Sequence, residues 1–311
     1  MSVTEARPGA TAARGGRRGQ GPGGRRRLGA GGRRALALGL QVGPATAFVA
    51  FFLLAPLVVF FLYSLWRVRD YEIVAEWNLD AYKQALTDDS YRRLLWNTIK
   101  IAGGASLLSA GLAFAFAHTL RFKLRRWQEP LLFAVVIAMF SGYLVRVYAW
   151  RTLLGDSGIV NSALRGLGIT SEPLSFLLFN RGAAIVVLAN FLIPLAVLPV
   201  YAALQNVRDA EIEAARDLGC GSWGTFWRVT APLAWPGIFF SWALAFLAAA
   251  GDYVVPQLVG GANGTMVGVV ITDTFQTDYN FPRGAALAFT TLLVSLTIIG
   301  IVRFVGGKVL R

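Results

Sequence analysis

The residues best suited to chemistry are a few charged and aromatic side chains inside otherwise apolar segments. Asp252 lies beside Tyr253, so the pair offers a carboxylate and an aromatic face to a cationic ligand. A charged side chain in an apolar span is costly, and it therefore marks a wet cavity, a pathway or an oppositely charged partner. The alternative to ligand binding is that Asp252 pairs with Arg146 or Arg151, or lies at the outer interface.

Nucleophilic, metal and phosphate chemistry find little support. Cys220 is the only cysteine and His118 the only histidine, so we expect no catalytic residue and no metal site. His118 is interpreted as a packing or interfacial residue. The phosphate loop G-x-x-x-x-G-K-[S/T] is missing, since Gly306-Gly307-Lys308 is followed by Val309. We therefore expect a chain that is not an enzyme and that holds no cofactor of its own.

The composition indicates how these residues are positioned. Of the 311 residues, 55 % are hydrophobic and 15 % are charged, and the apolar residues come in blocks long enough to cross a bilayer as helices. Backbone polar groups in lipid must be satisfied within the segment, which favours helices. The fold class is therefore all-α, a polytopic membrane protein with a six-helix domain over residues 44–305. We predict spans over residues 44–66, 94–120, 130–154, 182–205, 236–259 and 284–304.

The positions of the positive residues that give the formal charge of +13 follow the predicted membrane topology. Residues 1–36 form an Arg/Gly-rich tail that we predict to be disordered and cytoplasmic. With both ends inside, the predicted cytoplasmic segments hold 19 lysines and arginines and the external ones 8, which satisfies the positive-inside rule. This distribution indicates contact with the lipid bilayer, and we expect no nucleic-acid partner.

The stretch from Val207 to Pro232 reads as two short helices between the fourth and fifth spans. Asp209 is a predicted N-cap, and Gly219 suits the left-handed position that ends a helix. Helical spacing predicts one charged face, with Glu213, Arg216 and Asp217, and an opposite apolar face, with Ala214, Ala215 and Leu218.

A second helix is predicted to start at Ser222 as N-cap, with an aromatic stripe of Trp223, Phe226 and Trp227. Such a pair of helices along the bilayer surface would suit docking of a soluble partner, and an ordinary interfacial hairpin is the alternative.

Part of this stretch resembles the EAA loop of ABC importer permeases. The resemblance rests on Glu213-Ala214-Ala215, on Gly219 and on Val229-Thr230-Ala231-Pro232, where Val229 and Ala231 depart from the family's isoleucine and leucine. It implies that the loop enters a cleft of a cytoplasmic ATPase and transmits its closure to the spans. The residues implied in coupling are Glu213 as polar anchor, Ala214 and Ala215 as packing surface, Gly219 as turn, with Asp217 and Pro232.

Further segments resemble permeases of the spermidine/putrescine type. They are residues 144–150, 158–164, 193–201, 251–261 and 280–286. The family's proline upstream of Leu144 is missing, so the third span is expected to be straighter than in relatives. The implied substrate path includes Asp252, Tyr253, Arg146, Tyr148 and Trp150, although Arg146 and Arg151 would repel a cation.

Together these features imply the permease subunit of a type I ABC importer, with a MetI-like fold in the inner membrane, working by alternating access. The implied partners are a second homologous permease, an ABC ATPase dimer that binds ATP and Mg²⁺, and an extracytoplasmic binding protein. The favoured cargo is a polyamine. Alternatives are an opine, aminoethylphosphonate, thiamine or ferric iron as cargo, or a secondary transporter without an ATPase.

Overall fold

The computed structural model describes residues 30–69 and 72–309, and residues 1–29 of the predicted disordered tail lie outside this range. The chain divides into two units at Pro56 and Leu57, within the first helix. That helix, α1 (Ala30–Tyr63), begins earlier than predicted, so residues 30–36 are helical and do not belong to a disordered tail. The alanine- and leucine-rich sequence that follows favours a helix, which extends back through these residues.

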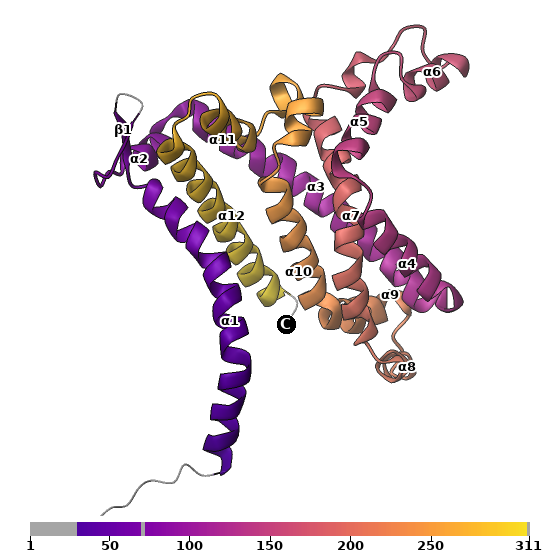
Figure 1. The fold of residues 1–311 in the computed structure, drawn as a ribbon. Helices are drawn as coiled ribbons and strands as arrows, with labels where there is room; N and C mark the ends of the chain where they lie inside the picture. Colours follow the sequence, from indigo (N-terminus) through magenta and orange to yellow (C-terminus); the bar gives the residue numbers. More distant parts are fainter. Residues whose placement is uncertain (1–29, 70–71, 310–311) are drawn as a thin grey trace, which may run out of the picture. The chain divides into compact units, whose positions relative to one another are not determined.

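The second unit contains the remaining elements (Figure 1). An antiparallel hairpin of β1 (Arg67–Arg69) and β2 (Glu72–Val74) is a small exception to the predicted all-α fold. The helices that follow are α2 (Asp80–Thr87), α3 (Asp89–Phe122), α4 (Gln128–Met139), α5 (Tyr143–Leu154), α6 (Ile159–Gly166), α7 (Arg181–Gln205), α8 (Asp209–Asp217), α9 (Ser222–Thr225), α10 (Ala231–Ala250), α11 (Val267–Gln276) and α12 (Phe281–Val309). Short 3₁₀ or π segments are η1 (Arg125–Trp127), η2 (Ser175–Leu177), η3 (Phe226–Thr230), η4 (Pro256–Gly260) and η5 (Ala262–Gly264).

Helices α3, α7 and α10 form the centre of this unit. α3 presents a stripe of buried small residues to its neighbours, including Ala102, Ala105, Ser109 and Ala113. Small residues let helix backbones approach closely, which favours association in a bilayer, where lipid is as apolar as leucine. A β-carbon on Gly237 of α10 would lie 2.2 Å from the Ala203 β-carbon of α7, so this crossing requires glycine.

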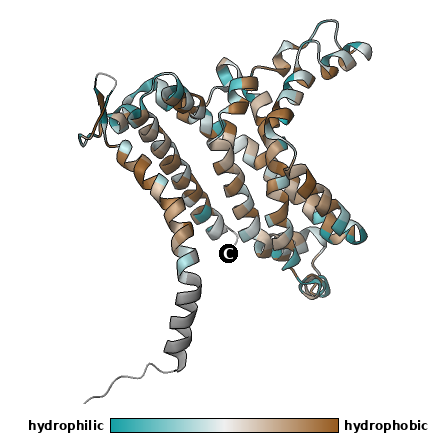
Figure 2. Ribbon diagram, viewed as in Figure 1, coloured by the Kyte–Doolittle hydropathy of each residue, from teal (hydrophilic) through white to brown (hydrophobic). Residues whose placement is uncertain are grey.

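Within the described residues, five helices are long and apolar enough to cross a membrane, and the pair α4–α5 makes a sixth if it is counted as one span. Apolar residues follow the middle of α3, α7, α10 and α12, while polar residues gather at the helix ends and on α8 (Figure 2). α8 and the end of α12 lie on the same side of the second unit, and α6 and α11 lie on the opposite side.

The third span is bent, because the helical segments Arg125–Met139 and Tyr143–Gly166 meet at an angle of 91°. That this span is straighter than in relatives stays a prediction. The break falls at Ser141 and Gly142, which are poor helix formers. Arg146 Nη2 donates a hydrogen bond of 2.5 Å to the Ala138 carbonyl, at the end of α4, which also accepts the Ser141 N–H at 3.3 Å. The guanidinium therefore stabilises the bend.

The predicted fifth span, residues 236–259, is shifted. The helix runs from Ser222 to Ala250 through the π segment η3, and it ends before Gly251. The Ala231 N–H reaches back to the Phe226 carbonyl, and this wider turn accommodates Pro232, whose ring would clash with the carbonyl of a regular turn. Ser222 is the first residue of α9 and Gly221 is its N-cap, one residue before the prediction.

Candidate functional site

α8 begins with a charged cap that differs from the predicted one. Arg208 is the N-cap, and Asp209 occupies the first turn. The Glu211 carboxylate accepts the Arg208 backbone N–H at 3.2 Å and its guanidinium at 2.6 Å. Hydrogen bonds from the Arg208 side chain lower the pKa of Glu211, so this cap is present at neutral pH and is lost as the pH falls through the acidic range.

The end of α8 follows the prediction. Gly219 has a φ of +84°, and the Cys220 N–H donates to the Ala215 carbonyl at 3.0 Å. Only glycine adopts this conformation without strain. The residue type at position 219 therefore fixes the turn between α8 and α9.

Asp209 joins α8 to α3 through an ion pair. Arg121 Nη2, at the end of α3, lies 3.0 Å from Asp209 Oδ1 and 3.4 Å from the Val207 carbonyl oxygen. The Arg121 side chain is only 13 % exposed, and Arg125 approaches the other Asp209 oxygen at 3.7 Å. The pair is better shielded from solvent than an ordinary surface pair, and it links the loop to a central helix.

The predicted apolar face of α8 is divided in the structure. Ala215 is buried, whereas Ala214 is exposed and Leu218 is 86 % exposed. The predicted face is wrong for Leu218 because the helix ends at Asp217, so Leu218 no longer follows the helical spacing. Glu213 and Asp217 are also exposed. The outward surface of α8 is thus a mixture of carboxylates and apolar side chains.

The predicted aromatic stripe is confirmed, and it extends this surface. Trp223 is 73 % exposed, and its ring centroid lies 5.7 Å from that of Trp227 and 5.9 Å from that of Phe226. Phe226 packs inward, with ring centroids 5.7 Å from Phe114 and 6.1 Å from His118 on α3. His118 therefore lies in an aromatic cluster, as its interpretation as a packing residue requires. We call Glu213, Ala214, Leu218, Trp223 and Trp227 the docking surface.

We expect the ion pair between Arg121 and Asp209 to set how firmly α8 follows α3. Arg121→Glu leaves two carboxylates facing each other, and the rate of the ATP-coupled uptake that the resemblance to ABC importer permeases implies should fall by about tenfold. The double variant R121E/D209R restores the attraction and should recover most of the uptake. If the double variant is as impaired as the single one while both melt like the wild type, the pair does not transmit motion.

Asp252 lies outside α10, in the break between Ala250 and Val254. The Tyr143 hydroxyl donates to Asp252 Oδ2, and Asp252 Oδ1 accepts the Val255 N–H at 2.9 Å. Among the described residues neither Arg146 nor Arg151 forms an ion pair with it. The alternative in which an arginine pairs with Asp252 is therefore not found, because Tyr143 contacts the carboxylate while Arg146 bonds the Ala138 carbonyl.

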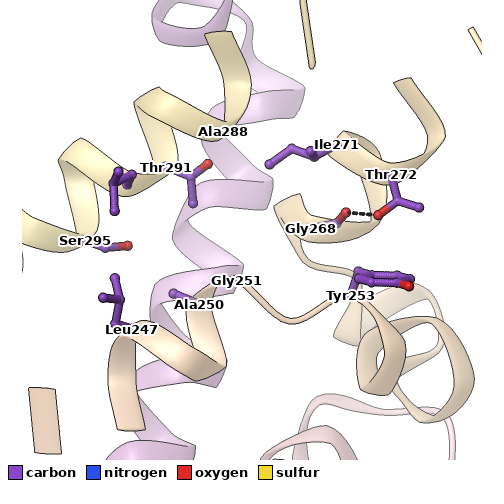
Figure 3. Close-up of a pocket in the computed structure, with 11 residues that line it drawn as sticks. Leu247, Ala250, Gly251, Tyr253, Gly268, Ile271, Thr272, Ala288, Thr291 and Ser295 are labelled. Carbon is purple, nitrogen blue, oxygen red and sulfur yellow. Dashed lines mark hydrogen bonds between the residues drawn. The ribbon is translucent and has the colours of Figure 1, made fainter. Parts of the chain in front are cut away.

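A cavity of about 410 Å³ lies beside this break, between α10, α11 and α12 (Figure 3). Tyr253 lines it, as do Thr272 of α11 and Thr291 and Ser295 of α12. Leu247, Ala250, Ile271 and Leu292 supply apolar surface. Hydroxyl oxygens and a tyrosine ring in an apolar cavity can accept hydrogen bonds and face a cation.

The structure separates the residues predicted for the substrate path. Tyr253 lines the cavity, and Asp252 lies between two of its lining residues, with its carboxylate directed to Tyr143. Arg146 lies over the Phe191 ring at 5.8 Å, and neither it nor Tyr148 or Trp150 lines this cavity. Sequence reasoning missed Thr272, Thr291 and Ser295. The signal in the sequence was the presence of hydroxyl residues in two apolar helices. Such residues often only donate a hydrogen bond to a backbone carbonyl of their own helix, so the signal is weak.

Comparison with known proteins identifies the family to which this fold belongs. Residues 111–311 match the family model described as the binding-protein-dependent transport system inner membrane component. The chain belongs to this family. It is therefore a multi-pass inner-membrane protein and the membrane component of a binding-protein-dependent transport system, and both the docking surface and the cavity lie within the matched residues.

Curated relatives of this permease include spermidine/putrescine transport system permease proteins. The chain is 34 % identical to PotB of Haemophilus influenzae over 67 % of its own length and 73 % of the relative's. It is 32 % identical to PotB of Escherichia coli, over 70 % of this chain and 78 % of that one. A chain in the crystal structure of a bacterial alginate ABC transporter, in complex with an alginate pentasaccharide-bound periplasmic protein, has the same fold. The TM-score is 0.65 at 16 % identity, over 90 % of this chain and 96 % of the other.

Proposed function

We propose that this permease is one of two membrane subunits of an ATP-driven polyamine importer, with both termini in the cytoplasm. The observation that carries the proposal is the docking surface on α8 and α9, which is exposed on one side and joined to α3 on the other. Exposed tryptophans beside a carboxylate have the composition of a protein interface. Its partner would be a cytoplasmic ABC ATPase dimer, which binds ATP and Mg²⁺.

The mechanism follows from how the loop is attached. Closure of the ATPases on ATP would displace α8, and the ion pair with Arg121 would pass that displacement to α3. Since α3 packs along α7 and α10, the central helices would move together. A binding protein on the external side would then deliver its cargo to the opened path, and this chain itself would catalyse no reaction.

The proposed cargo is a polyamine such as putrescine or spermidine. The two PotB relatives carry this cargo in their names, and the cavity beside Tyr253 offers hydroxyl oxygens and an aromatic face to ammonium groups. Asp252 would contribute negative potential at the cavity wall while its bonds to Tyr143 and the Val255 N–H hold the break in place.

The proposal is tested in proteoliposomes that contain the importer assembled from this chain and its partner subunits. We expect ATP-dependent uptake of labelled putrescine or spermidine when the binding protein is present. The Asp252→Asn variant keeps the shape of the side chain, and its uptake should fall by about tenfold. Glu172→Asn, on an exposed external loop, is the matched control and should transport normally.

Uptake of an opine, aminoethylphosphonate, thiamine or ferric iron in place of both polyamines would contradict the proposed cargo. The proposal that the protein belongs to an ATP-driven importer would stand. Uptake of any solute that continues without the ATPase subunits would contradict the importer itself. It would support a secondary transporter.

A further inference from the structure

Three arginines near one end of α3 are paired with acids. Arg67 lies 2.5 Å from Asp80, and Arg92 lies 3.3 Å from Asp89. Arg69 lies 3.4 Å from Glu76. These pairs neutralise positive charge on the side that the proposed topology assigns to the exterior, where lysine and arginine are disfavoured.

Three cations at this end lack such a partner and gather in one place. Arg93, Lys100 and Arg181 line a cavity of about 530 Å³ together with Trp96, Asn97 and Asn263. No carboxylate lines this cavity, and across residues 43–69 and 72–308 none of the three cations lies within ion-pair distance of one. Three positive charges in one pocket repel each other, so an anion would stabilise the arrangement. We call this cavity the cationic pocket.

The cationic pocket is held in shape by hydrogen bonds between three parts of the chain. Arg181 Nε, at the start of α7, donates to Asn97 Oδ1 of α3 at 2.8 Å. Asn97 Nδ2 in turn donates to the carbonyls of Asn263 at 3.0 Å and Thr265 at 2.6 Å. Only the Nε of Arg181 is used in these bonds, which leaves its two Nη groups to face a ligand. A guanidinium presented in this way suits the oxygens of a phosphate.

The surroundings of the cationic pocket favour a lipid as the source of the phosphate. Trp96 is 58 % exposed, and Lys100 Nζ lies 5.1 Å from the centre of its ring. Tryptophan next to a cation is typical of the headgroup level of a membrane. Leu107 lies on the same face of α3, two turns further along, and it is 66 % exposed. The face therefore changes from cationic to apolar over about 10 Å, as a phospholipid does from its phosphate to its chains.

We propose that the cationic pocket binds the phosphate of an anionic phospholipid. The assignment to the outer leaflet rests on the proposed function, whereas the binding itself does not. The bound phosphate would neutralise Arg93, Lys100 and Arg181 and hold the ends of α3 and α7 together. It would also remove positive charge from the side at which a cationic solute arrives.

The test uses the full-length chain purified from membranes and native mass spectrometry to count bound lipid. Nanodiscs contain phosphatidylglycerol, which is anionic, or phosphatidylcholine, which is not. We expect retained phosphatidylglycerol on the wild type, and at least about tenfold less on the triple variant R93Q/K100Q/R181Q. The matched control, K83Q/R165Q/R283Q, removes the same charge from exposed positions outside the cationic pocket and should retain lipid like the wild type.

Two further arms separate the sources of the anion. Inorganic phosphate at millimolar concentration should leave the lipid in place, and its displacement by phosphate would identify free phosphate as the ligand and overturn the proposal. Equal lipid retention by all variants, with weaker docking of the binding protein to the triple variant alone, would assign the pocket to a protein partner and overturn it as well. The lipid count needs no transport, so a failed polyamine assay leaves this result standing.

Discussion

Gly237→Leu is expected to prevent stable folding of the permease. A β-carbon at this position would lie 2.2 Å from the Ala203 β-carbon and 3.0 Å from the Pro199 carbonyl oxygen. The backbone of α7 cannot yield locally, because Ser241 of α10 donates to the Ala196 carbonyl at 2.9 Å and fixes the two helices side by side. Forcing them apart should destabilise the protein by more than about 3 kcal/mol.

The measurement is the folded, monodisperse fraction after extraction in mild detergent, together with its melting temperature. Gly300→Leu is the matched control, since Gly300 lies in α12 with no atom within 4 Å of the added β-carbon. It should extract and melt like the wild type, apart from the small gain that a better helix former brings. A Gly237→Leu protein that melts with the control would show that α7 and α10 do not cross as the structure has them.

Glu213→Arg is expected to uncouple the permease from the proposed ATPase partner. Glu213 is exposed, and among the described residues no hydrogen bond or ion pair holds its side chain, so the change should not disturb folding. In the proposed complex Glu213 faces the ATPase, so the substitution would reverse the charge at a desolvated contact. Association with the ATPase should weaken by more than about a hundredfold.

Co-purification of the ATPase with tagged permease measures this effect directly, and ATP-driven uptake should fall in parallel. Glu172→Arg makes the same charge reversal on a loop at the other end of the bundle, and it should leave both readouts unchanged. Normal ATPase recovery with Glu213→Arg would remove Glu213 from the docking surface. Trp223→Ala would then test whether the aromatic part of the surface carries the contact.

Local patterns in the sequence predicted much of the docking loop. The helix of α8 and the left-handed turn at Gly219 depend on residues only a few positions apart, and both are found as expected. The role of Asp209 was not predicted, because its partner Arg121 comes 88 positions earlier in the chain. Capping rules consider only neighbours along the chain, so they assigned Asp209 to the helix end.

The third span shows the same limit. Its apolar composition and length predict one crossing segment, and the missing proline predicts one that is straighter than in relatives. A break at Ser141 and Gly142 bends the segment by 91°, and Arg146 donates a hydrogen bond across the break to the Ala138 carbonyl. Hydropathy measures transfer into lipid, and it carries no information about where a helix is interrupted within the membrane.

The sequence by itself determined the membrane class, the long apolar helices, the charged loop between the fourth and fifth of them, and the family resemblance. These depend on composition, on helical spacing and on short motifs, which are properties of contiguous residues. Only the tertiary structure decided what Asp252 contacts, since its partner Tyr143 lies 109 positions away, and which hydroxyl groups share its cavity. It also decided that Arg93, Lys100 and Arg181 meet in one pocket, because packing of α3 against α7 sets which distant side chains become neighbours.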